Sequence, residues 1–159
     1  MTAVVVVMLF VASAVVAAAV VVRTNKRKFA EANVVVPGTA TKAPAEWAGA
    51  HTPEARMHRR LRDAVAALRA NPAMEDAVMV DARVSLEQQA LAVDERLIAV
   101  AALPGRVRAE PLASVASAVD AVEAAVAALT AGPGERTGLD RAMTEVADRV
   151  AELEQGGTV

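Results

Sequence analysis

An uninterrupted apolar stretch occupies residues 2–22, which carry no charged side chain. At a helical rise of about 1.5 Å per residue, a helix of this length extends roughly 31 Å, which matches a hydrocarbon core of about 30 Å. A basic cluster follows directly and consists of Arg23, Lys26, Arg27 and Lys28. The pattern predicts a transmembrane signal-anchor helix over 1–22.

The order of charge and apolar stretch indicates the topology. In a secretory signal peptide the positive charges precede the apolar run, whereas here they follow it. Because positive charge is retained in the cytoplasm, we expect a single-pass protein of the cell membrane with its N-terminus outside and its C-terminal body cytoplasmic. The small residues Ala12, Ala14 and 17–19 leave cleavage and export of the body as the alternative.

Breakers dominate the segment that follows, and residues 23–52 are expected to form a basic juxtamembrane segment and a linker. Pro37, Gly38, Pro44 and Gly49 lie at spacings that prevent regular structure. Trp47 is expected either in the headgroup layer or over one end of the body.

From residue 53 onward, apolar side chains recur at helical spacing. The pattern predicts a bundle over 53–155 with helices over about 53–70, 73–103, 111–130 and 138–155, followed by a tail over 156–159. Thr52, Pro53 and Glu54 combine a capping hydroxyl, a proline at the first helical position and an acid near the positive end of the helix dipole. Short connections favour antiparallel neighbours, so the predicted fold class is all-α: one N-terminal transmembrane helix followed by an up-and-down bundle of about four helices.

Two of these helices have informative patterns. In the helix over 111–130, apolar residues alternate spacings of three and four, as in a coiled-coil seam; they are Leu112, Val115, Val119, Val122, Val126 and Leu129. The helix over 73–103 has two opposed apolar stripes, so we expect it to contact two neighbours. One stripe holds Val84, Leu91, Ile98 and Ala102; the other holds Leu86, Ala90, Val93, Leu97 and Val100.

The net charge of −2 conceals an uneven distribution. Residues 23–50 and 51–70 each carry five Lys or Arg against two acids, whereas 71–159 carry seven against fifteen. Anionic headgroups attract a basic membrane-proximal half, so we expect contact with the membrane surface or an acidic partner through the first cluster and through Arg56, Arg59, Arg60 and Arg62. The alternative is pairing of these arginines with acids of the second and fourth bundle helices. Nucleic acid is not expected, because the body is acidic and offers almost no aromatic stacking surface.

Candidate chemistry is sparse. Glu54, His58 and nearby His51 offer a metal too few ligands without a matched set on a facing helix, so we expect no metal and no cofactor. Cysteine is absent and no serine lies in a nucleophile elbow, so we expect no enzyme. Glu87, Gln88 and Glu95 on the long helix are weak ligand-binding candidates, and ordinary surface carboxylates are the alternative.

These features favour a membrane-anchored, non-enzymatic interaction or scaffold module at the cytoplasmic membrane face, binding other proteins or its own copies. The alternative is a membrane-tethered ligand-binding or sensory module that uses the polar stripe of the long helix. Abundant Ala, Val and Arg with few Lys indicate a bacterial source with a high-GC genome. The layout is similar to that of LemA-type bacterial proteins; this resemblance is one of layout and implies neither site residues nor an activity.

Overall fold

The computed structural model describes residues 33–131 and 136–156. The chain divides into two compact units, Met1–Ala32 and Asn33–Val159, and all described residues belong to the second. The helix expected over 1–22 and the basic cluster of Arg23, Lys26, Arg27 and Lys28 lie outside the described residues.

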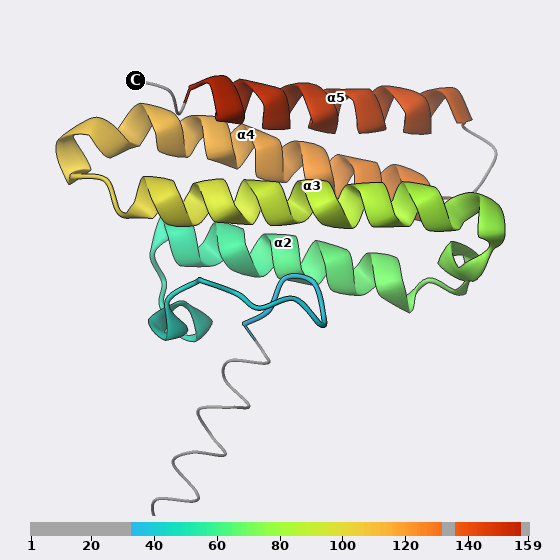
Figure 1. The fold of residues 1–159 in the computed structure, drawn as a ribbon, viewed down its shortest axis with the longest axis horizontal. Helices are drawn as coiled ribbons and strands as arrows, with labels where there is room; N and C mark the ends of the chain where they lie inside the picture. The colour runs from blue at the N-terminus through green and yellow to red at the C-terminus, as the bar shows by residue number, and fades with distance from the viewer. Residues whose placement is uncertain (1–32, 132–135, 157–159) are drawn as a thin grey trace, which may run out of the picture. The chain divides into compact units, whose positions relative to one another are not determined.

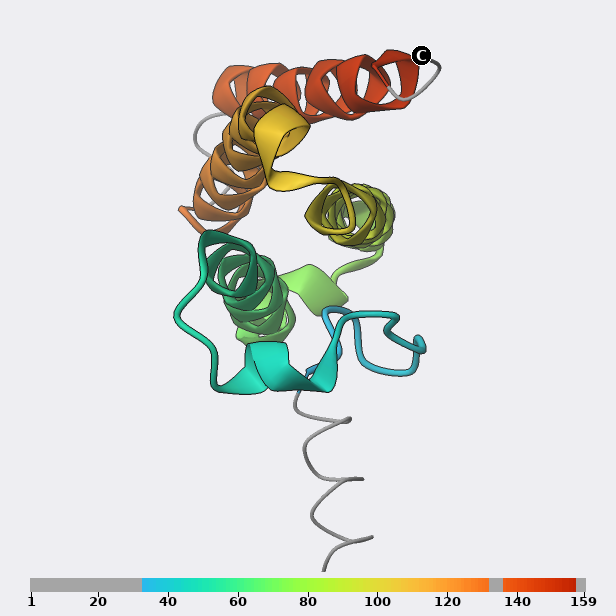
Figure 2. The same cartoon turned by 90° about the vertical axis from the view of Figure 1, so that its left-hand side faces the viewer.

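Four α-helices form the described body, and no strand occurs in it, which confirms the all-helical prediction. They are α2 (Pro53–Ala70), α3 (Ala77–Ala101), α4 (Gly105–Thr130) and α5 (Arg136–Gln155), with short 3-10 helices η1 (Ala45–Ala48) and η2 (Pro72–Glu75) before α2 and α3 (Figure 1). Helices α3 and α4 contact each other, and α2 and α5 each contact both. The end-on view in Figure 2 places α2 and α5 on opposite sides of the α3 and α4 pair.

Side-chain caps set the bounds of α2. The Thr52 hydroxyl accepts a hydrogen bond from the Ala55 amide at 3.3 Å, and Pro53 occupies the first helical position. At the other end, the Asn71 side chain accepts from the Ala73 amide at 3.0 Å and begins η2. Local sequence therefore determines where this helix starts and stops.

The single helix expected over 73–103 is interrupted. Asp76 has an extended backbone (ψ 135°) that separates η2 from α3. Met74 of η2 is buried in the core, so the turn that Asn71 and Pro72 begin folds back onto the bundle instead of continuing as a helix. The sequence prediction missed this break because no further proline or glycine marks it.

Helix α4 begins at Gly105, six residues before the expected start at Pro111, so that start was wrong. Pro111 lies inside the helix and has no N–H to donate to the Val107 carbonyl. Val107 is 52 % exposed, which lets water reach that turn. The Arg108 guanidinium donates to the Leu103 carbonyl at 3.0 and 2.6 Å and holds the first turn against the preceding connection.

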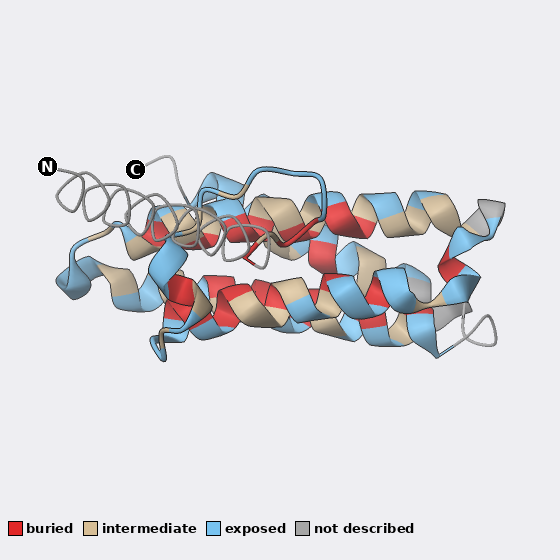
Figure 3. Cartoon of the chain, turned by 90° about the horizontal axis from the view of Figure 1, so that it is seen from below, coloured by how far each residue is buried: buried red, intermediate tan, exposed pale blue. Residues whose placement is uncertain are grey.

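The predicted seam of α4 lies in the core. Val115, Val119 and Val122 are fully buried, and the small residues Ala118 and Ala125 between them are fully buried as well. Figure 3 shows buried positions along the faces that the helices turn toward one another. By length and composition α4 is also the one described helix that could cross a membrane, although much of its apolar surface is covered by the other helices.

The two stripes of α3 have different surroundings. The stripe from Leu86 to Val100 is buried against the bundle, as expected. On the opposite stripe, Leu91 and Ile98 are partly buried and face residues 35–42, whereas Val84 remains 41 % exposed. The segment that precedes the bundle therefore covers this stripe of α3, and it leaves part of the stripe exposed.

Candidate functional site

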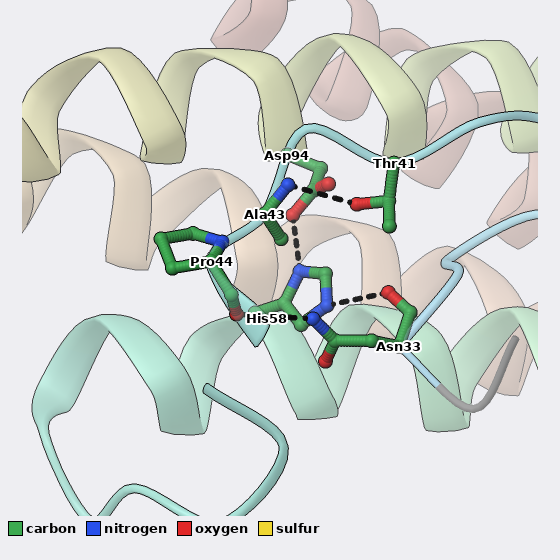
Figure 4. A network of polar contacts seen from close by, with 6 residues as sticks. All are labelled: Asn33, Thr41, Ala43, Pro44, His58 and Asp94. Carbon is green, nitrogen blue, oxygen red and sulfur yellow. Dashed lines mark hydrogen bonds and ion pairs between the residues drawn. The ribbon is translucent and has the colours of Figure 1, made fainter. Parts of the chain in front are cut away.

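The imidazole of His58 occupies the centre of a buried polar network. Its Nδ1 lies 2.6 Å from Asp94 Oδ1 of α3, and its Nε2 lies 2.9 Å from the backbone carbonyl oxygen of Asn33 (Figure 4). The Asn33 side-chain amide in turn donates to the Pro44 carbonyl at 3.2 Å. A carbonyl and an ionised carboxylate both accept, so the two contacts of the ring form together as hydrogen bonds when each ring nitrogen carries a proton.

This network attaches residues 33–52 to the bundle. The Trp47 ring packs edge-on against His58 with centroids 5.6 Å apart, and the Arg59 guanidinium donates to the carbonyls of Trp47 and Ala50 at 2.7 and 2.8 Å. Val35 and Val36 are buried in the core. Residues 33–52, the described part of the linker expected over 23–52, therefore pack against the bundle. The segment is irregular apart from η1, and its apolar side chains bind the bundle.

Of the two positions expected for Trp47, the structure shows the second, because its ring is buried against the body. His58 itself lies on the apolar side of α2, three residues before Leu61 and seven before Val65, which are both fully buried. That register was the signal in the sequence that His58 is a core residue. No local signal identified Asp94, which lies 36 residues away.

A cavity of about 300 Å³ lies between residues 35–42 and α3. Its lining includes two of the three predicted ligand-binding residues, Gln88 and Glu95. Glu87 lies elsewhere, because its carboxylate accepts hydrogen bonds from Arg69 at 2.7 and 2.8 Å. The rest of the lining is Val35, Thr39, Ala40, Thr41, Lys42, Leu91, Ala92, Asp94 and Ile98.

Polar groups lie both inside this cavity and at its rim. Asp94 is buried, and its Oδ2 accepts no hydrogen bond from any residue that the structure describes, since the imidazole takes Oδ1. At the rim, Lys42 Nζ lies 3.4 Å from Glu95 Oε1, with side chains 79 and 68 % exposed. The cavity thus has inside it a carboxylate oxygen that accepts no hydrogen bond from the described residues, and a solvent-exposed ion pair at its edge.

The arginines of α2 have diverse partners. Arg60 donates to Glu123 through Nε and Nη2 at 2.8 and 2.5 Å and to Asp120 at 2.6 Å. These hydrogen bonds, first to Glu123 and then to Asp120, raise the Arg60 pKa. Arg62 pairs with its neighbour Asp63, whereas Arg56 is exposed.

Internal pairing of the α2 arginines therefore differs from the expected pattern. The acids that bind Arg60 belong to α4 rather than to the second or fourth bundle helix. Arg69, outside the predicted set, pairs with Glu87 of α3, whose hydrogen bonds raise the Arg69 pKa. Membrane-surface contact by Arg56, Arg59, Arg60 and Arg62 stays a prediction.

Glu54 and His58 do not converge on a common point. Glu54 is buried and accepts from Arg108 Nη1 at 3.0 Å, whereas His58 contacts Asp94 and Asn33. The hydrogen bond from its own backbone N–H, aided by Arg108 and Thr52, lowers the Glu54 pKa despite burial. Within residues 33–131 and 136–156, no group of three or more His, Cys, Asp or Glu could hold a metal ion.

No protein-family model, curated protein or solved structure matches this chain. Its two distinctive features are the His58 network and the adjacent cavity.

Proposed function

We propose that this chain is a single-pass membrane-anchored helical-bundle protein that acts as a non-enzymatic interaction or scaffold module at the cytoplasmic face of the cell membrane. One observation carries the proposal: Asn33, the first described residue after the unit that contains the expected anchor, is bound directly to the bundle through His58. The body therefore begins at Asn33, so residues 33–52 do not form a free connection between it and the expected anchor.

The distribution of charge supports a presenting role. Helix α5 lies on the side of the bundle opposite α2, and Asn33 contacts α2. Exposed acids line α5, namely Asp140, Glu145, Asp148, Glu152 and Glu154. In this proposal the α5 face is presented to a partner protein, or to a second copy, and the α2 side lies toward the anionic headgroups.

Fractionation and topology test the anchor. We expect the full chain with a C-terminal tag to stay in the membrane fraction after carbonate washing. We also expect the tag to resist protease added to intact cells and to become digestible once the membrane is opened. A tag in the soluble fraction, or one digested from outside intact cells, would contradict the proposal.

Proximity labelling from the same C-terminal tag tests the presenting face. The double change Glu145→Lys and Asp148→Lys reverses charge at the centre of the exposed α5 face, and we expect it to remove specific labelled neighbours. Glu75→Lys with Asp81→Lys, which reverses two exposed acids outside α5, is the matched control. Equal labelling by both variants and the unchanged protein would argue against an α5 interface.

A second candidate function is a membrane-tethered ligand-binding or sensory module. The observation that favours it is the cavity of about 300 Å³ that Gln88 and Glu95 help to line, a volume at the small end of ligand pockets. Residues 35–42 form one wall of this cavity and belong to the segment held by His58. Occupancy would therefore act on the part of the body that follows the expected anchor in the sequence.

A further inference from the structure

We propose that the cavity between residues 35–42 and α3 binds a small aliphatic amine whose ammonium group donates to Asp94 Oδ2; this inference rests on the second candidate function. The starting point is a buried carboxylate with one oxygen bonded to His58 and the other without a donor among the described residues. Only 6 % of the Asp94 side chain is exposed, and it lines the cavity. Asp94 Oδ2 is accessible from the cavity, so a ligand that supplies a donor can bind it there.

The other residues that line the cavity favour a ligand whose remaining part is aliphatic and uncharged. Val35, Leu91, Ala92 and Ile98 provide apolar walls that suit an aliphatic chain. Among the lining residues the charged groups are Asp94, Glu95 and Lys42, so acids outnumber bases. A carboxylate or phosphate ligand would meet this excess of negative charge, whereas an ammonium is attracted and brings three donors.

Lys42 already forms, at the rim of this cavity, the kind of ammonium–carboxylate contact that we propose for the ligand. Its ammonium lies beside Glu95 at the rim, in an exposed ion pair of the kind that contributes little stability. An entering amine can therefore displace Lys42 at small cost. The ligand ammonium would then lie in a site that contains two carboxylates, Asp94 and Glu95.

The chain contains a single isoleucine, Ile98, and this residue lines the cavity. Labelling the δ1 methyl group of isoleucine with ¹³C in the full chain, held in uncharged detergent, gives one signal at the site. At constant pH we expect n-butylamine to shift this signal saturably, with a Kd on the order of 1 mM for so small a ligand. We expect n-butanol and butyrate, of matched length, to leave the signal in place.

Three variants sharpen the test. Ala92→Met fills the cavity and is expected to weaken amine binding at least tenfold, whereas Ala66→Met at an exposed position of α2 leaves binding unchanged. Lys42→Ala removes the internal competitor and is expected to tighten binding severalfold. Circular dichroism of each variant verifies that the fold is retained.

The possible results distinguish failure of the proposed amine site from failure of the cavity as a ligand site. Equal shifts with butanol or butyrate that Ala92→Met abolishes would overturn the amine proposal while keeping the cavity as a ligand site. Absence of any saturable shift, or amine binding that Ala92→Met does not change, would overturn both the amine site and the second candidate function.

Discussion

His58 Nδ1 and Asp94 Oδ1 lie 2.6 Å apart in the interior, although 36 residues separate them along the chain. The other nitrogen of the same ring holds the carbonyl of Asn33. One side chain thus joins α2, α3 and the start of the described body. We infer that the arrangement of the segment 33–52, and with it the wall of the adjacent cavity, depends on this imidazole.

Replacing His58 with leucine should destabilise the protein strongly. The change leaves the Asp94 carboxylate buried without its donor, and removing one member of a buried pair costs about 3–5 kcal/mol. Trp47 is the single tryptophan and lies against His58, so its fluorescence in urea titrations reports the free energy of unfolding.

The double variant His58→Leu with Asp94→Leu provides the control. Removing both polar partners avoids an isolated buried charge, so we expect it to recover a large part of the lost stability. A single His58→Leu variant that loses less than about 1 kcal/mol would show that the network contributes little.

Lowering the pH should reduce the contribution of Glu54 to the free energy of unfolding. Because the pKa of Glu54 is lower in the folded protein than its ordinary value of 4.5, its ionised form stabilises the fold at pH values above 4.5. That stabilisation is lost as the pH falls through the lowered folded-state pKa. The difference in unfolding free energy between the unchanged protein and Glu54→Gln should therefore be largest near pH 6 and shrink below about pH 4.

Glu75→Gln, at an exposed position, is the matched control for this pH dependence. We expect its stability to follow that of the unchanged protein across the acidic range. If the Glu54→Gln difference were constant with pH, the buried Glu54 carboxylate would not be the group that titrates.

Local patterns predicted the helices, but they did not predict how the preceding segment packs. The alternating valines of α4 and the cap at Thr52 act through neighbours in sequence, so periodicity and residue type revealed them. The pairing of His58 with Asp94 joins two positions that local patterns cannot relate. Prolines and glycines suggested a linker over 23–52, and they gave no sign that Val35 and Trp47 within it are buried against the body.

A charge on the seam of α4 should unfold the bundle. Val122 is fully buried, so Val122→Asp places an unpaired carboxylate in an aliphatic core and is expected to cost several kcal/mol, comparable to the stability of a whole domain. Ala124→Asp adds the same charge to an exposed position of the same helix. Thermal melting followed by circular dichroism should show a large loss for Val122→Asp and a small change for Ala124→Asp; equal melting would place the seam outside the core.

The contacts of Arg60 with Glu123 and Asp120 predict a modest, salt-sensitive contribution to stability. The Arg60 side chain is 41 % exposed, so solvent screens these ion pairs and Arg60→Ala should cost no more than about 1 kcal/mol. Arg60→Lys keeps the charge but lacks the planar fork that binds Glu123 through two nitrogens, and we expect it to retain only part of the effect. Urea titrations at low and high salt should show the Arg60→Ala loss shrinking as salt is added. A loss that salt does not change would indicate that packing of the aliphatic stem between α2 and α4, rather than its charge, makes the contribution.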